Sequence, residues 1–258
     1  MTVFAMWPST LTLVAAVAVI GTRQLGLMVL MHEAAHWLIL PDRRMNDRVA
    51  KWLCAYPLWG SLTPYRREHH LHHRHTQQPE DPDLPLTAPF PVTCGTLSRA
   101  ALGDLTAWTV CASVPAWWRA LAPRGWRGLR GPIASNAVLF AVLVCAGSWY
   151  LYPLLWLLPL ATWYQLVSRL RRIAEHAVVP DNDDPLRNTR TTAAGLLART
   201  FLAPYWVNYH LEHHLLVFVP CWKLRRAHAL LMAKGYGERM ELASGYPDVV
   251  LRVTSPRL

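Results

Sequence analysis

Long apolar stretches alternate with polar blocks along the chain. Val3–Ile20 and Leu25–Leu40 carry almost no charge, and the polar residues 21–24 between them predict a tight turn. Ile133–Ser168 contains no charged residue over 36 positions. As one helix it would measure about 54 Å, far more than the ~30 Å hydrocarbon core of a bilayer, and Pro153 is expected to interrupt it. The pattern therefore predicts four membrane spans in two hairpins, at about 3–20, 25–40, 133–152 and 154–170.

Two segments of the polar blocks mix apolar and basic residues at helical spacing, Asn46–Trp59 and Leu97–Arg119. Helices of this kind either lie along the membrane surface or cover the soluble face of the core, and the sequence leaves both readings open. The run 77–83 has too many prolines for a helix and predicts an ordered loop.

The composition agrees with a membrane protein. Of the 258 residues, 53% are hydrophobic and 16% are charged, whereas a typical soluble domain has about 25% charged residues. The mean hydropathy is +0.14. We therefore expect residues 1–258 to form a single domain, an all-α integral membrane protein with about four transmembrane helices.

The distribution of charge bears on topology and partners. The net charge is +10, and it divides into +5 in residues 41–132 and +5 in residues 169–258, outside the apolar stretches. The positive-inside rule gives this pattern when both blocks, and with them both termini, face the cytoplasm. No aromatic-basic RNA-binding motif occurs, so membrane topology explains the charge and no nucleic-acid partner is expected.

Ten of the twelve histidines fall in three short groups. The first is an HxxxH motif and the other two each contain HxxHH. Side chains three or four positions apart share one helix face, so each motif can direct its imidazoles at one point, and neutral imidazole is a good ligand for iron, zinc or copper. All three motifs, and one isolated histidine after the last predicted span, reach the same side of the membrane. The candidate metal ligands are His32, His36, His69, His72, His73, His176, His210, His213 and His214.

Nine nitrogens are too many for one metal ion and suit two. His70 and His75 should point away from the ligand face of their motif, and the isolated His228 reads as a packed or interfacial residue. No catalytic residue beyond the metal ligands is predicted. The five scattered cysteines form no CxxC pair, and neither a dinucleotide-binding glycine turn nor a haem or iron–sulfur motif occurs.

The three motifs and their surroundings resemble the membrane fatty acid desaturase and hydroxylase superfamily over nearly the whole chain. The resemblance includes Tyr65–Thr76, the acidic loop Pro79–Asp83 and the segment Asn208–Leu215. The short length and the 76–83 loop look closest to the branch typified by dihydrorhizobitoxine desaturase. The resemblance implies a cytoplasmic helical cap in which the nine histidines bind two iron ions.

The resemblance also implies an activity. O2 would be the co-substrate, and electrons would come from an external carrier, a ferredoxin or a cytochrome b5-type protein on the basic cytoplasmic face. The expected reaction introduces a C=C bond into the acyl chain of a membrane lipid. Hydroxylation, or desaturation of a small amino-acid-derived enol ether precursor, remains open because the histidine motifs are common to these outcomes.

Neighbouring polar residues complete the resemblance. Five carboxylates are candidates to accept imidazole N–H groups and orient the ligands, or they are solvated surface acids; they are Glu33, Asp81, Asp83, Glu175 and Glu212. Some family members have an asparagine four residues before the isolated histidine, holding a metal-bound water. Arg172 stands there in this chain, and Asn208 is a candidate substitute.

Two other functions use the same residues differently. His32–His36 also reads HExxH, the motif of zinc proteases, although such a site needs one more ligand and leaves six or more of the motif histidines without a role. A metal transporter would place its ligands near the middle of the spans, which here are almost free of histidine.

Overall fold

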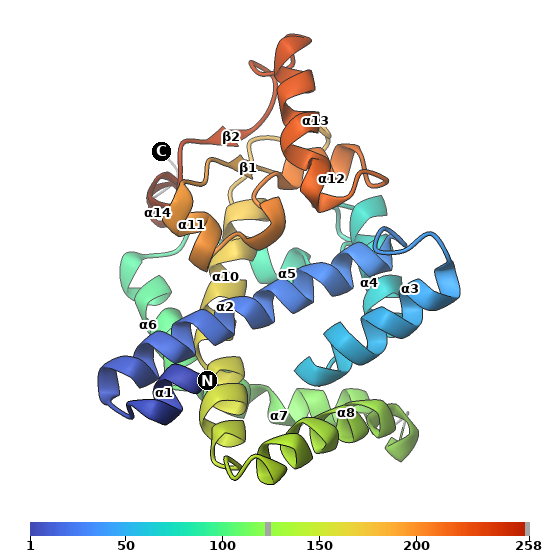
Figure 1. The fold of residues 1–258 in the computed structure, drawn as a ribbon. Helices are drawn as coiled ribbons and strands as arrows, with labels where there is room; N and C mark the ends of the chain where they lie inside the picture. The colour runs from blue at the N-terminus through green and yellow to red at the C-terminus, as the bar shows by residue number, and fades with distance from the viewer. Residues whose placement is uncertain (122–124, 256–258) are drawn as a thin grey trace.

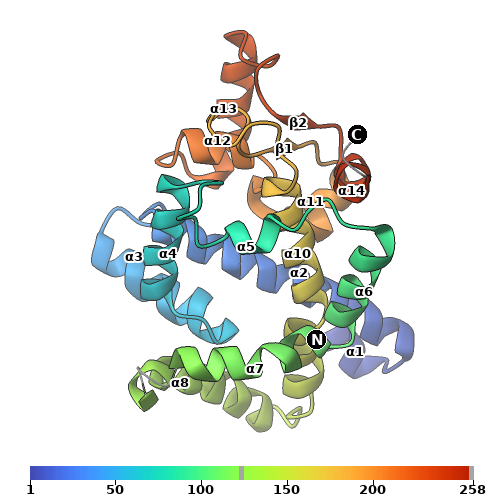
Figure 2. The ribbon, with the colours of Figure 1, turned by 180° about the vertical axis from the view of Figure 1, so that it is seen from behind.

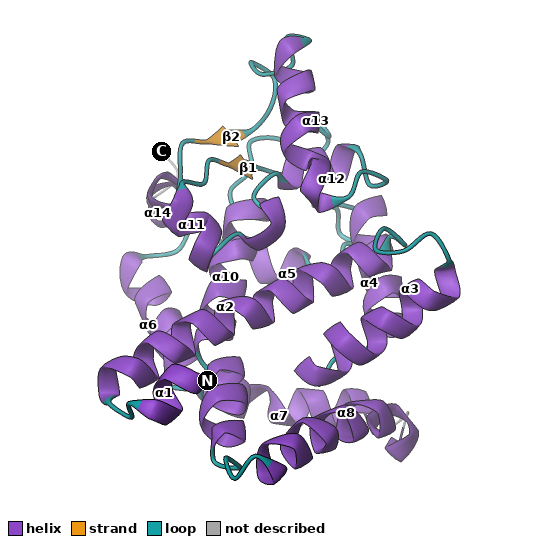
Figure 3. Cartoon of the chain, viewed as in Figure 1, coloured by secondary structure: helices purple, strands orange, loops and turns teal. Residues whose placement is uncertain are grey.

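The computed structural model describes residues 1–121 and 125–255, and most of them are helical (Figure 3). The α-helices are α1 (Thr2–Met6), α2 (Thr10–Ala35), α3 (Arg43–Val49), α4 (Leu62–Arg74), α5 (Leu84–Thr87), α6 (Cys94–Leu105), α7 (Trp108–Leu121), α8 (Gly125–Cys145), α9 (Leu158–Ala161), α10 (Trp163–His176), α11 (Leu196–Phe201), α12 (His210–Leu215), α13 (Cys221–Ala233) and α14 (Tyr246–Thr254). Short π- or 3-10 helices are η1 (Ala50–Ala55), η2 (Tyr56–Leu58), η3 (Pro153–Leu157) and η4 (Pro204–Trp206). Two-residue strands β1 (Thr191–Thr192) and β2 (Leu242–Ala243) pair in parallel.

The helices are arranged around α2, which runs obliquely through the middle of the molecule (Figure 1). Helix α10 packs across it, and η1 and α4 pack on its C-terminal half. Helices α7 and α8 lie at one end of the molecule, and α11–α14 with the small sheet lie at the other (Figures 1 and 2). The predicted all-α class is confirmed, apart from that small sheet.

The turn predicted at residues 21–24 is wrong, because α2 continues through it as one 26-residue helix. The polar side chains there bind neighbouring helices instead of forming a turn. Thr22 donates to the carbonyl of Phe201 at 3.1 Å and accepts from the Trp163 indole at 3.0 Å, while Gln24 donates to the Trp156 carbonyl at 2.8 Å. In an apolar environment such interhelical bonds satisfy polar groups without breaking the helix.

The second apolar stretch does form two helical segments, but the break lies earlier than predicted. Helix α8 begins at Gly125 and ends at Cys145, and the turn that follows contains Gly147 at φ +65°. Pro153 falls in the first turn of the returning segment, where its missing N–H costs little. A kink at Thr162 then separates this segment from α10.

Two helices, α2 and α8, are long and apolar enough to cross a membrane, by their length and composition. The predicted spans 3–20 and 25–40 fall largely within α2, and the span predicted at 154–170 is divided by the kink. Large apolar side chains of both helices face outward, including Leu11, Val14, Val138 and Val142, each at least 61% exposed.

The segments Asn46–Trp59 and Leu97–Arg119 are helical as predicted, as α3–η2 and α6–α7. The loop predicted at 77–83 is also confirmed.

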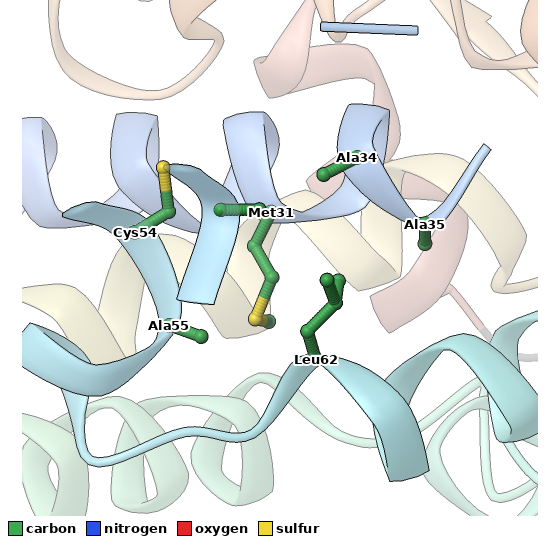
Figure 4. Packing of buried hydrophobic residues seen from close by; sticks show 7 residues of the cluster. Met31, Ala34, Ala35, Cys54, Ala55 and Leu62 are labelled. Atoms are coloured by element: carbon green, nitrogen blue, oxygen red, sulfur yellow. The ribbon is translucent and has the colours of Figure 1, made fainter. Parts of the chain in front are cut away.

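A small-residue contact sets the first histidine motif against the second. Met31, Ala34 and Ala35 of α2 pack against η1 and Leu62 of α4 (Figure 4). Ala34, Ala35 and Leu62 are fully buried. Alanine lets the helices approach closely, and complete burial of a leucine stabilises such a contact by about 1.5–3 kcal/mol. This packing fixes the end of α2 beside α4.

Candidate metal centre

Four helices bring the nine predicted ligands together. The C-terminal end of α2 supplies His32 and leads into His36, and α4, α10 and α12 supply the others. The imidazoles form two groups in which the possible ligand atoms lie within 4.8 Å of one another. The first, the five-histidine cluster, contains His32, His36, His69, His73 and His213. The second, the four-histidine cluster, contains His72, His176, His210 and His214.

The two HxxHH motifs are shared between the clusters in a reciprocal way. His69 and His73, one turn apart on α4, enter the five-histidine cluster, whereas His72 enters the other. On α12, the pair His210 and His214 enters the four-histidine cluster, and His213 crosses to the first. Each motif therefore ties the two clusters together.

The spacing of the nitrogens fits metal ligation. In the five-histidine cluster, the Nε2 atom of His69 lies 2.8 Å from the Nε2 atom of His36 and 3.0 Å from the Nε2 atom of His73. In the other cluster, the Nε2 atom of His210 lies 2.8 Å from that of His176 and 3.0 Å from that of His214. Nitrogens about 2.1 Å from one ion, in neighbouring positions of an octahedron, are about 3.0 Å apart.

The electrostatics also fit. Burial, reinforced by neighbouring histidines, holds the pKa of His69, His213 and His214 well below the usual value, so these rings are neutral near pH 7. The Nε2 atom of His32 is buried and has no hydrogen-bond partner among the described residues. A buried imidazole nitrogen without a partner is costly unless a metal or another group binds it. The donor set therefore fits two metal ions.

Three of the five candidate carboxylates contact cluster imidazoles. Asp81 lies 2.9 Å from the Nδ1 atom of His72, and Glu33 lies 3.3 Å from that of His32. A Glu175 oxygen is 3.5 Å from the Nδ1 atom of His210, close but outside good hydrogen-bond geometry.

The other two carboxylates act differently. Glu212 is fully buried and accepts hydrogen bonds from the Thr191 hydroxyl and from the Nδ1 atom of His228. Asp83 bonds Asp81 through its backbone N–H, at 2.9 Å. His228, expected to be a packed residue, is therefore held by a buried acid.

The remaining histidines behave as expected. His70 and His75 belong to neither cluster, and the ring of His70 bonds the Ala35 carbonyl at 3.1 Å. Asn208, the candidate substitute for the family asparagine, donates to the Thr192 carbonyl at 3.0 Å, and its Oδ1 atom is buried without a partner among the described residues.

Three supporting residues were not predicted. Arg171 is buried and donates to Glu175 at 2.6 Å. Gln77 donates to the His176 carbonyl at 2.8 Å, and Arg66 donates to the carbonyls of Ala34 and Ala35 at the end of α2. An arginine at a helix C-terminus satisfies its free carbonyls. The partners of Gln77 and Arg66 lie at distant positions, where no local pattern records them, whereas Arg171 and Glu175 lie four residues apart on α10.

One pocket is lined by residues of both clusters, and a second lies away from them. A polar pocket of about 350 Å³ is lined by His73 and His214, one ligand candidate from each cluster, and by Arg74 and Asp183. The rings of His73 and His214 stack there at 4.2 Å between centroids. A pocket of about 450 Å³ with mostly apolar walls lies between η2, α7 and the segment 157–165.

Comparison with known proteins agrees with this geometry. The sequence pattern of a family described as fatty acid desaturase matches residues 8–244. Dihydrorhizobitoxine desaturase of Bradyrhizobium elkanii is 28% identical over 239 residues, which cover 84% of this chain and 67% of that protein. The beta-carotene ketolase of Paracoccus sp. (strain PC1) is 25% identical over 208 residues, 78% of this chain and 73% of that protein. Zeaxanthin 4-ketolase of Chlamydomonas reinhardtii is 26% identical over 216 residues, 77% of this chain and 40% of that protein.

The family match covers all nine histidines of the two clusters. It confirms the resemblance found in the sequence motifs, and the names of the relatives denote oxidoreductases. This chain belongs to the fatty acid desaturase family.

Proposed function

We propose that the chain is a membrane-bound, O2-dependent diiron oxidoreductase that acts on an unactivated C–H bond, and that it is a desaturase of an acyl chain. The observation that carries the proposal is the gathering of nine imidazoles into clusters of five and four. Two iron ions held there would supply, together with O2, the oxidising chemistry that no side chain can provide.

The protein residues would bind and orient. The nine histidines, most of them buried, would present their Nε2 atoms to the metals. Asp81 and Glu33 would hold the opposite ring nitrogen of His72 and His32, which fixes the tautomer and the ring orientation. Burial of the clusters would keep water away from the reacting carbon.

The reaction outcome is proposed from the relatives. Desaturation is favoured because dihydrorhizobitoxine desaturase matches the larger share of this chain, and the carotenoid ketolases make oxygen insertion the alternative. The apolar pocket lined by Leu157, Leu160 and Val114 supports an acyl substrate. The name of the first relative supports a small amino-acid-derived substrate equally well.

The electron source is proposed to be a soluble carrier, a ferredoxin or a cytochrome b5-type protein. The pocket beside His73 and His214 supports docking there, because it opens toward both clusters. Carrier-dependent turnover should fall when salt screens the basic cytoplasmic face. Turnover that is indifferent to salt and to reversal of Arg74 would contradict docking by charge.

We also propose a multi-pass topology with the clusters and both termini on the cytoplasmic side. The apolar exposed faces of α2 and α8 and the positive charge of the blocks outside the apolar stretches support this orientation.

Metal analysis of the detergent-purified protein tests the central proposal. We expect two iron ions per chain, one lost in His213→Ala, one lost in His72→Ala, and both lost in the double variant. His70→Ala is the matched control, because its ring lies outside both clusters, and it should retain both ions.

One zinc ion per chain, indifferent to His213, would instead support the HExxH protease. The structure gives that alternative little support, because Glu33 is buried and accepts from the backbone N–H of Cys221 at 2.8 Å. Metal uptake into proteoliposomes without retained iron would support a transporter.

A further inference from the structure

A basic pocket lies between the middle of α2 and the segment that contains α11 and η4. Its volume is about 490 Å³, and its walls include Arg23, Arg199, Tyr205 and Trp206 but none of the cluster histidines. We call it the arginine pocket. Ala203 in its wall packs against Val29, one helical turn before His32. The pocket is therefore close to the metal centre but separate from it.

Two arginines, Arg23 and Arg199, line this pocket, and the guanidinium of Arg225 lies over its Trp206 wall. The guanidinium groups of Arg199 and Arg225 lie 4.6 and 5.3 Å from the centre of the Trp206 ring. Arg23 donates to the Thr200 carbonyl at 2.7 Å. The arginine ion pairs of residues 1–121 and 125–255 involve other positions, namely Arg66, Arg67, Arg169, Arg171, Arg190 and Arg252. The positive charge at the pocket therefore has no carboxylate partner in contact, which favours an anionic ligand.

The aromatic wall of the pocket has an unusual backbone. Tyr205 and Trp206 both have left-handed φ angles, 55° and 63°. Two successive bulky residues rarely adopt this conformation, so the surrounding packing must hold it. Gly26 of α2 leaves room for the Tyr205 ring, because a Cβ atom at this position would lie 3.1 Å from that ring. The fold thus holds both rings beside the arginines.

The surroundings of the pocket are apolar and exposed. Leu196 and Leu197 of α11 are 73% and 75% exposed, and Val19 of α2 is 49% exposed. Arg23 is the only Lys, Arg, Asp or Glu among residues 1–32. A charged side chain on an apolar helix is tolerated at the membrane surface but is costly at the centre of the bilayer. Tryptophan and tyrosine also favour the membrane surface, so the residues of this pocket suit that depth.

We infer that the arginine pocket binds the anionic phosphate headgroup of a membrane lipid. The phosphate lies among Arg23, Arg199 and Arg225, and the acyl chains extend along Val19 and the two exposed leucines of α11. Basic side chains at the surface of a bilayer recognise anionic lipids in this way. The inference does not depend on the reaction, because it concerns residues outside the metal centre.

Native mass spectrometry of the iron-loaded protein in a non-ionic detergent tests the inference. Phosphatidylglycerol, phosphatidylcholine and inorganic phosphate are titrated separately, and the bound molecules are counted. We expect one phosphatidylglycerol to bind at least tenfold more tightly than phosphatidylcholine. The double variant Arg199→Gln/Arg225→Gln should lose at least tenfold in affinity for it while retaining its iron and its melting temperature.

Arg187→Gln is the matched control, because Arg187 is exposed and lies outside the pocket walls. It should bind phosphatidylglycerol like the unmodified protein. Equal binding of the two lipids, or an equal loss in the control, would overturn the inference. Inorganic phosphate that binds as tightly as phosphatidylglycerol would indicate a free-anion site and overturn it as well. Because the readout is lipid binding, failure of the proposed reaction would leave this result unaffected.

Discussion

Polar residues around the clusters contact the Nδ1 atoms of imidazoles whose Nε2 atoms point into a cluster. Asp81 does this for His72, and it also accepts the backbone N–H groups of Gln77 and Asp83, both at 2.9 Å. The Thr76 hydroxyl lies 3.2 Å from the Nδ1 atom of His214. The 77–83 loop is therefore ordered by the same carboxylate that orients a ligand, so loop conformation and ligand geometry depend on one side chain.

Replacing this carboxylate should weaken one cluster selectively. In Asp81→Ala the His72 ring loses its acceptor, and we expect a loss of about 10–100-fold in iron affinity at the four-histidine cluster. Iron titration followed by optical absorption measures it. Asp83→Ala is the control, because Asp83 donates to Asp81 through its backbone N–H, which alanine also has. Equal losses in the two variants would mean that the loop, rather than the Asp81–His72 contact, determines affinity.

The buried pair Arg171–Glu175 should be important for stability. Burial raises the pKa of Glu175 to about 7, and Arg171 opposes the rise. Arg171→Met removes that partner and leaves the acid buried beside His210, which should lower the free energy of unfolding by about 3–5 kcal/mol. Thermal unfolding in detergent measures the change. The double variant Arg171→Met/Glu175→Met should recover part of it, and a double variant no more stable than the single one would contradict the pairing.

Among the elements, α2 has the largest role, because it connects the apolar half of the molecule to the five-histidine cluster. Its crossing with α10 depends on Gly21, where a Cβ atom would lie 2.9 Å from the Trp163 side chain. Local polarity predicts a turn at residues 21–24. The prediction is wrong because the partners of Thr22 and Gln24 lie about 130–180 positions away in the chain, where no local pattern records them.

Gly21→Val should separate α2 from α10. We expect a destabilisation of about 1–3 kcal/mol from overpacking, together with reduced iron content in the five-histidine cluster. Thermal unfolding and metal analysis of one preparation measure both. Gly95→Ala is the control, because a Cβ atom at this exposed helical position has no neighbour closer than 3.9 Å. It should be neutral or slightly stabilising. A fully stable, iron-replete Gly21→Val protein would refute the importance of the crossing.

For the whole molecule, the clusters serve as cross-links between helices far apart in sequence. Each contains residues from at least three of α2, α4, α10 and α12 or their ends, so bound metal should stabilise the tertiary structure as well as the site. Without metal, two unfavourable features would remain in the fold. The imidazoles would be in close contact with one another, and some buried ring nitrogens would have no hydrogen-bond partner among the described residues. Stability and metal content should therefore be linked.

Removal of the metal should lower the melting temperature. A ligand at a hundred times its dissociation constant adds about 2.7 kcal/mol, which corresponds to roughly 5–10 °C for a chain of this size. Differential scanning fluorimetry before and after chelation, and after readdition of iron, measures the shift. The double variant His36→Ala/His214→Ala should melt at one temperature under all three conditions. An unmodified protein equally insensitive to chelation would show that the clusters do not link the helices through metal.

The sequence alone predicted the histidines of the candidate metal centre and the broad class of the protein. Eight of the nine ligand candidates could be named because their spacing of three and four residues is a local property of a helix, and the isolated His176 was named from its position after the last predicted span. The helical class, the 77–83 loop and the apolar segments followed from local patterns in the same way. Tertiary structure decided how the histidines divide into five and four, since that depends on how α4 and α12 face each other. It also decided the continuity of α2, the role of Arg66 and the arginine pocket, because each arises from contacts between residues far apart in the chain.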